Sequence, residues 1–184
     1  PDIPINVKYS FKNGSHLQAG AVLRNMYYKD EVEDKDRIVT GWGASLSGIW
    51  QFAENTSLCF QGVYGKGISN YIQDISGSGL DLVPSATAEG KLKAFNAWGG
   101  YIGFSHNWSK VLTSNIMYSY ARALDRYGMP ATSYKYAQYA ATNLFWDFSE
   151  YGSCAIEYVF GRRNDFNKDY GNASRINTMI QYRF

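Results

Sequence analysis

Apolar residues recur at every second position along most of this chain, and this alternation constrains the fold more than any other feature of the sequence. Successive side chains of a β-strand point to opposite faces, so the pattern predicts strands with one apolar and one polar face. Helical spacing is almost absent. The alternating apolar positions fall in nine segments, at residues 3–11, 17–23, 38–52, 58–64, 98–108, 112–120, 144–148, 156–160 and 176–184.

The expected strands, of about ten residues or more, are long for a water-soluble protein, in which strands average about 5–6 residues. A tilted strand that crosses a membrane needs about 9–11 residues. Mean hydropathy is −0.36, as expected where apolar and polar residues alternate through a membrane barrel. We therefore expect an all-β fold, an antiparallel transmembrane β-barrel with about nine strands, formed by residues 1–184 as a single domain.

The connections between these segments are of two kinds, which alternate along the chain. Short connections include Asn13-Gly14, the strongest local hairpin signal, and Ser109-Lys110. Long connections are expected at 28–37, 70–93, 123–135 and 164–173, and they carry much of the charge. Transmembrane barrels place short turns on the periplasmic side and long loops outside, so this sorting favours the membrane interpretation.

An odd number of strands places the two chain ends on opposite sides of the membrane, whereas complete bacterial barrels normally have an even number. The sequence begins Pro1-Asp2-Ile3 without an initiator Met or an apolar leader. We therefore expect a barrel that is incomplete on its N-terminal side. An unpaired strand edge in lipid is very costly, so the remaining strands should come from another segment of the same protein or from elsewhere in the assembly.

Two sets of motifs resemble known outer-membrane proteins. The segment from Arg175 to Phe184, with Tyr182 two residues before the terminal Phe, resembles the C-terminal signal that the bacterial barrel-assembly machinery reads. More of the chain resembles the DcaP-like trimeric outer-membrane porins. The stretches that carry this resemblance are 1–3 leading to Ala21-Val-Leu-Arg24, Gly65-Lys-Gly-Ile-Ser-Asn-Tyr71, His106-Asn-Trp108, Asn143-Leu-Phe-Trp146, Glu157-Tyr-Val-Phe-Gly-Arg-Arg163, and Ser174-Arg-Ile176 to the end of the chain.

The resemblance implies the C-terminal half of a sixteen-stranded barrel, a homotrimer in the bacterial outer membrane, and passive diffusion of small anionic solutes such as dicarboxylates. The sequence departs from the family pattern at Ser69-Asn70, where a basic residue is expected near the loop. This departure bears on which solute is preferred.

Charged residues on the polar face are the candidates for lining a pore. Rings of Arg or Lys select anions, because the low-dielectric wall focuses their field. Arg24, Arg163 and Arg175 are expected along an anion path, with Lys12 and Arg183 nearer the periplasmic mouth; Glu157 could instead pair with one of these arginines across strands. The full set of expected pore-lining residues is Lys8, Arg24, Asp147, Glu157, Arg163, Arg175 and Arg183.

The sequence leaves the position of the longest loop and two alternative functions open, and it contains no motif for catalysis or for binding a metal or cofactor. The loop 70–93 could fold into the lumen as a constriction or simply cap the surface. No catalytic motif, metal-ligand spacing or cofactor signature occurs, so we expect no enzyme, no metal and no cofactor. Two alternatives to an open channel remain: a soluble β-barrel or sandwich that binds a ligand, and a structural outer-membrane barrel that does not conduct.

Overall fold

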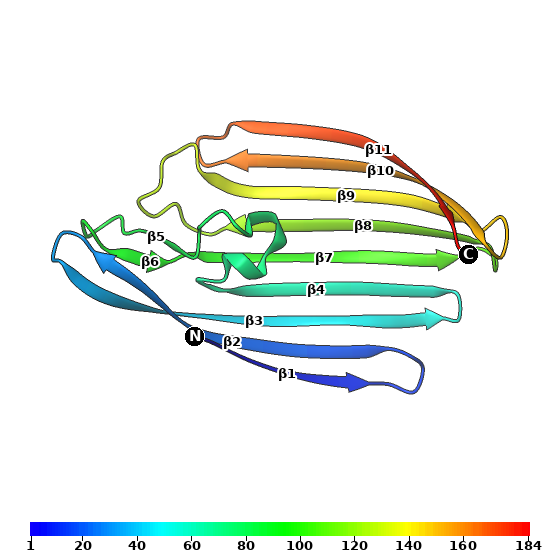
Figure 1. The fold of residues 1–184 in the computed structure, drawn as a ribbon, viewed down its shortest axis with the longest axis horizontal. Helices are drawn as coiled ribbons and strands as arrows, with labels where there is room; N and C mark the ends of the chain where they lie inside the picture. Colours follow the sequence, from blue (N-terminus) through cyan, green and yellow to red (C-terminus); the bar gives the residue numbers. More distant parts are fainter.

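A computed structural model describes residues 1–184 as one antiparallel sheet of nine strands in the order β1-β2-β3-β4-β7-β8-β9-β10-β11 (Figure 1). Each large strand pairs with the next large strand in the sequence, so the sheet is a meander, as the alternation of the sequence predicted. The strands are β1 (Asp2–Ser10), β2 (His16–Asp30), β3 (Lys35–Ala53), β4 (Thr56–Lys66), β7 (Asn96–Asn107), β8 (Leu112–Ala123), β9 (Tyr134–Trp146), β10 (Gly152–Asp165) and β11 (Tyr170–Tyr182).

The connection between β4 and β7 is the longest in the chain and has structure of its own. It contains two single-turn helices, η1 (Ser69–Tyr71) and η2 (Gln73–Ile75), followed by a small hairpin of β5 (Leu82–Pro84) and β6 (Leu92–Ala94). We call residues 67–95 the long loop. It lies at the same end of the sheet as the loop of residues 124–133 (Figure 1).

The two faces of the sheet differ in chemistry. The face called here the apolar face carries side chains such as Ile5, Leu46, Ile102, Ile116 and Ile180, all of them exposed. The opposite face, called here the polar face, carries mostly small and polar side chains. Because side chains alternate along each strand, the register assigns every strand residue to one face.

Two of the four expected long connections prove to be tight turns. Strands β2 and β3 continue to Asp30 and Lys35, and β10 and β11 to Asp165 and Tyr170, so that only residues 31–34 and 166–169 form turns. The Asp30 carboxylate closes the first turn by accepting hydrogen bonds from the backbone N–H of Val32 and Glu33. The prediction of loops at 28–37 and 164–173 was wrong, because polar, charged residues extend these strands without apolar alternation.

The hydrophobic core lies at the long-loop end of the polar face. Ile68, Ile72 and Ile75 of the long loop are buried against Ala97 of β7 and Ala121 of β8. Val83, Phe95, Ala123, Met129 and Tyr134 complete this cluster. The long loop therefore folds onto the polar face.

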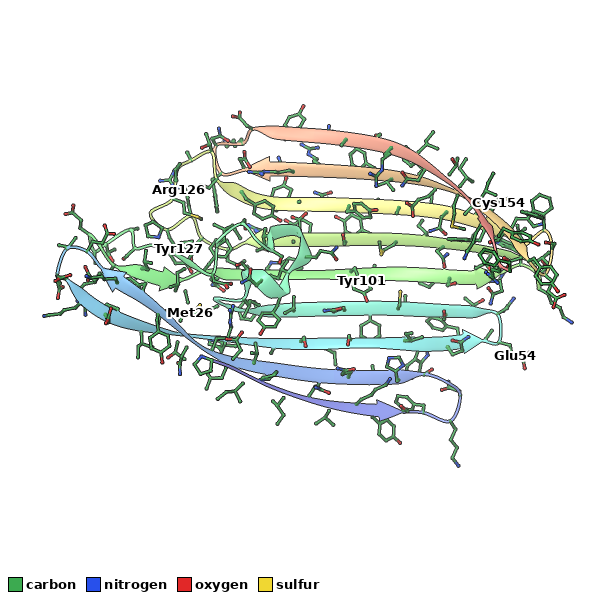
Figure 2. All side chains as sticks on the ribbon, viewed as in Figure 1. Met26, Glu54, Tyr101, Arg126, Tyr127 and Cys154 are labelled. Carbon is green, nitrogen blue, oxygen red and sulfur yellow. The ribbon has the colours of Figure 1, made fainter.

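The chain ends lie at opposite ends of the sheet, as the odd strand count predicted (Figure 1). The first strand starts among the long loops, and β11 runs to the end with short turns, where Glu54 also lies (Figure 2). Strands β1 and β11 are the two edges of the sheet and do not pair with each other. None of the helices has the length and apolar character needed to span a membrane.

Candidate functional site

The long loop approaches the polar face closely because the strands beneath it carry glycine or alanine. A Cβ atom placed on Gly99 of β7 would lie 3.1 Å from Cγ2 of Ile72, and one on Gly43 of β3 would lie 2.9 Å from Cγ2 of Ile68. Larger side chains at these positions would push the loop away from the sheet. The small residues thus form a seat for η1 and η2.

Arg24 of β2 fastens this loop to the strands. Its Nε atom lies 3.0 Å from Oδ2 of Asp2 in β1, and its Nη1 atom lies 2.9 Å from Oδ2 of Asp81 in the long loop. The guanidinium also donates to the carbonyl oxygen of Gly67. We call Arg24, Asp2 and Asp81 the latch, since they join β1, β2 and the loop through one nearly buried side chain.

Two more contacts of the loop support the latch. The hydroxyl of Tyr71 donates to Oδ2 of Asp2 at 2.8 Å, and this hydrogen bond, together with burial, raises the pKa of Tyr71. Ser69 and Asn70 donate to the Asp81 carboxylate at 2.7 and 2.8 Å. At Ser69-Asn70, where the family pattern led us to expect a basic residue, the chain therefore holds an acidic side chain in place.

The second helical turn of the loop is tied to the far side of its seat. The Tyr134 hydroxyl lies 2.6 Å from Oδ2 of Asp74 in η2 and 2.9 Å from the carbonyl oxygen of Ala121. Tyr134 is almost fully buried. The loop is thus held at one side by β1 and β2 and at the other by β8 and β9.

A cavity of about 600 Å³ lies between η1, η2 and the strands β4, β7, β8 and β9. Its lining includes the polar side chains Gln61, Gln73, Asp74, Ser119 and Tyr139. This volume falls in the range of small-molecule sites. The arrangement therefore offers a space with several polar side chains, which the loop covers from one side.

The structure places most of the expected pore-lining residues on the face that carries the loop, but not all of them on strands. Asp147 lies in the turn between β9 and β10, and Arg183 follows the last residue of β11. Both sit at the short-turn end. The residues on the polar face of the strands are Lys8, Arg24, Glu157, Arg163 and Arg175.

The environments of these charges differ. Arg163 pairs with Asp165 at 2.9 Å and remains well exposed. Glu157 pairs with no arginine and instead accepts hydrogen bonds from Asn143 and Asn177, at 3.4 and 2.9 Å. Arg175 is exposed and forms no ion pair. Of the three arginines expected along an anion path, only Arg175 is therefore without a carboxylate partner.

Sequence reasoning missed the residues that hold the loop. Asp2, Tyr71, Asp81 and the Asp74–Tyr134 pair are distant in sequence and carry no motif. A hint was available for Asp2 alone, because it lies opposite Arg24 once β1 and β2 pair as a hairpin about Asn13-Gly14. No group of three or more His, Cys, Asp or Glu side chains is placed to bind a metal ion.

The two aromatic residues of the expected assembly signal, Tyr182 and Phe184, are exposed. Tyr182 ends β11 on the apolar face, with its ring 6.4 Å from that of Tyr151, and Phe184 is fully exposed. Their role in assembly stays a prediction.

Comparison with known proteins identifies the family of this chain. Residues 3–184 match the DcaP outer membrane protein family. The chain belongs to this family. The match confirms the resemblance found in the sequence and the predicted outer-membrane location, and it excludes the soluble β-barrel or sandwich considered above.

One solved structure supports the same fold, and a second is more distantly similar. The outer membrane channel DcaP of Acinetobacter baumannii superposes with a TM-score of 0.81 at 19% identity, covering 100% of this chain and 51% of that channel. The chain thus spans about half the length of that channel. A NanC porin matches with a TM-score of 0.49 at 12% identity, covering 100% of this chain and 93% of that one. No curated protein matches the chain.

Proposed function

We propose that this chain forms part of the wall and the constriction of an outer-membrane channel through which small hydrophilic solutes diffuse passively. The observation that supports this best is the long loop folded onto the polar face, next to a cavity of about 600 Å³ whose lining includes several polar side chains. A selective channel requires a water-filled lumen, a constriction and an electric field from charged side chains, and it requires no catalytic group. Family membership supports the same proposal.

The barrel is closed in this proposal by strands that this chain does not supply. Strands β1 and β11 present unpaired backbone groups at both edges of the sheet. Such edges are very costly in lipid, where no water satisfies them. The remaining strands belong to another segment of the same protein, and the closed barrels associate as a homotrimer. The exposed Tyr182 and Phe184 form the signal read during assembly.

The solutes in this proposal are small anions of the dicarboxylate type. Lys8 and Arg175 lie on the polar face without an acidic partner, and Arg183 adds a positive charge at the short-turn end. Glu157 is the opposing charge on the same face. Since the two carboxylates beside Arg24 more than offset its positive charge, we assign the field to Arg175 and Lys8.

The test is the reversal potential of the protein in a planar bilayer under a tenfold KCl gradient. We expect a reversal potential with the sign of a channel that prefers chloride to potassium. Arg175→Ala should reduce this potential, and Glu157→Gln should increase it. Lys110→Ala, a change in the turn between β7 and β8, is the control and leaves the potential unchanged. A protein that inserts but carries no current would contradict the channel and favour the structural barrel.

A further inference from the structure

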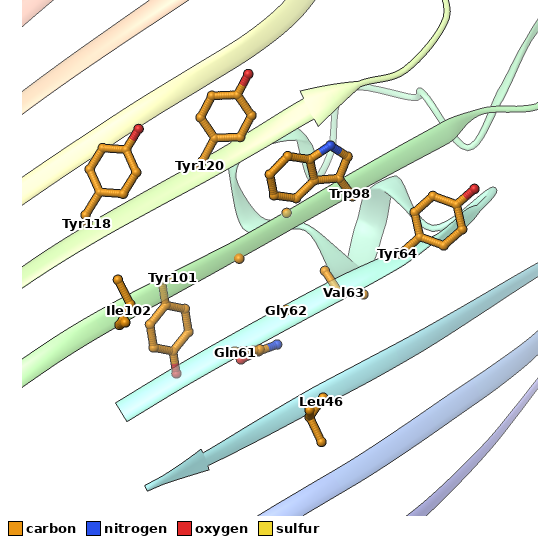
Figure 3. A pocket seen from close by; sticks show the side chains of 12 residues that line it. Leu46, Gln61, Gly62, Val63, Tyr64, Trp98, Tyr101, Ile102, Tyr118 and Tyr120 are labelled. Carbon is orange, nitrogen blue, oxygen red and sulfur yellow. The ribbon is translucent and has the colours of Figure 1, made fainter. Parts of the chain in front are cut away.

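The apolar face has one marked hollow, and glycine forms its floor. Gly62 of β4 and Gly100 of β7 lie directly opposite each other in the register, near the centre of the nine-stranded sheet. With no side chains at this pair, the backbone is bare over two adjacent strands. The hollow has a volume of about 680 Å³ and is open along the face (Figure 3). We call it the outer groove.

Aromatic and aliphatic side chains form the walls of the outer groove. Tyr64 and Trp98 stand on the side toward the long loops, and Ile102 and Leu46 stand on the other sides (Figure 3). Trp98 stacks on Tyr120, with ring centroids 5.1 Å apart. The walls are therefore held in place before anything binds, which lowers the entropic cost of ordering a flexible chain between them.

Two cations lie just beyond the groove, toward the long loops, and on the same face. Lys66 is the last residue of β4, one step on this face beyond Tyr64, and Arg122 lies directly opposite Trp98 in β8. Both are exposed, and neither forms an ion pair. No Asp or Glu occurs on the apolar face of β4, β7 or β8. These cations are therefore free to bind an anion.

A basic residue on a lipid-facing surface is costly unless it reaches the headgroup layer. Tyr and Trp side chains, which surround these cations, are typical of the same layer. An apolar groove that ends in two unpaired cations at this depth is complementary to one kind of molecule, an anionic lipid with a phosphate headgroup and acyl chains.

We propose that the outer groove is a binding site for a phosphate-bearing membrane lipid. Lys66 and Arg122 bind the headgroup phosphate, and one acyl chain lies over Gly62 and Gly100 between the aromatic walls. Long loops lie outside in this class of barrel, so the lipid belongs to the outer leaflet. The site lies on the opposite face from the cavity beside η1 and η2, so lipid binding does not depend on conduction.

Native mass spectrometry of the purified, assembled protein tests this with two probes that share their acyl chains, dioleoyl phosphatidic acid and dioleoyl phosphatidylcholine. The native protein is expected to retain phosphatidic acid in preference to phosphatidylcholine. Each of Lys66→Ala and Arg122→Ala weakens retention of phosphatidic acid by roughly fivefold, from the effect of one cation near a membrane surface. Equal retention of the two lipids, or no loss in the two variants, overturns the proposal.

A glycine substitution tests the groove itself. Gly62→Leu places a side chain in open space, because a Cβ atom there meets nothing within 4 Å, so the variant should fold and block the floor. Gly161→Leu is the matched control, since Gly161 is equally open but lies on the polar face. Loss of lipid in the first variant only is expected. If Gly62→Leu instead changes the oligomeric state and leaves lipid retention intact, the groove is a contact between subunits and the lipid proposal is wrong.

Discussion

The latch formed by Arg24, Asp2 and Asp81 allows a sharp prediction about the long loop. Arg24→Ala removes both ion pairs and the hydrogen bond to the Gly67 carbonyl. It also leaves two carboxylates without their partner. We expect the loop to leave the polar face far more often in this variant, while the sheet, whose strands pair through backbone hydrogen bonds, stays intact.

The magnitude follows from burial. The Arg24 side chain is 11% exposed, and its partners Asp2 and Asp81 are 36% and 18% exposed. Removing one partner of a fully buried pair costs about 3–5 kcal/mol, and solvent screening at Asp2 lowers this to about 2–3 kcal/mol. That free energy raises the ratio of detached to attached loop by about 30- to 150-fold.

Proteolysis of the folded protein measures this ratio, since cleavage follows the open population when the loop closes faster than it is cut. Trypsin can cut after Lys91 or Lys93 in the long loop. Glu157→Gln is the control, because its carboxylate accepts hydrogen bonds from Asn143 of β9 and Asn177 of β11 and pairs with no residue of the long loop. Cleavage of Arg24→Ala within about twofold of the native rate would refute the latch.

Three further predictions concern the same face of the sheet. Gly99→Val should displace η1 and η2, because the valine side chain would collide with Ile72. The single-channel conductance should then rise. Unchanged conductance would show that the long loop does not narrow the solute path. Arg175→Glu should shift the reversal potential toward cations by more than Glu157→Gln shifts it toward anions, since the first substitution changes the charge on the polar face by two units and the second by one; the reverse order would contradict the assigned field. The pKa of Tyr71 is raised in the folded protein, so its contribution to loop attachment is full below the ordinary tyrosine pKa of about 10 and is lost as pH rises through the folded value. Tryptic cleavage of the native protein should therefore increase at alkaline pH. Tyr71→Phe should remove this dependence on pH.

The nine-stranded sheet could be predicted from the sequence almost completely, because apolar and polar residues alternate along each strand and so mark its two faces. Register and the division into faces followed from that alternation and from turns such as Asn13-Gly14. The alternation did not predict the strand ends that extend beyond the apolar residues, as at Asp30, since both faces of the strand are polar there. Only the hydrogen bonds to the Asp30 carboxylate reveal the tight turn.

The site was less accessible to sequence reasoning. Arg24 was identified as a polar-face cation, but its charge is balanced by Asp81, 57 positions later in the chain, through a loop whose path has no periodic signal. The seat formed by Gly43 and Gly99 could not be predicted either. A glycine in a strand indicates that another part of the protein comes close, but the sequence does not show which part. The outer groove required the register, which places Gly62 opposite Gly100.

The central claim is that the two faces of this sheet meet different solvents, with lipid on the apolar face and water under the long loop. Single cysteines at two positions of β8, Ser119→Cys on the polar face and Ile116→Cys on the apolar face, test it in native outer membranes after Cys59 and Cys154 are replaced by Ala. A small charged thiol reagent added in water should modify the cysteine at position 119 and spare the one at position 116. Equal modification of both, or modification at position 116 alone, would contradict the account.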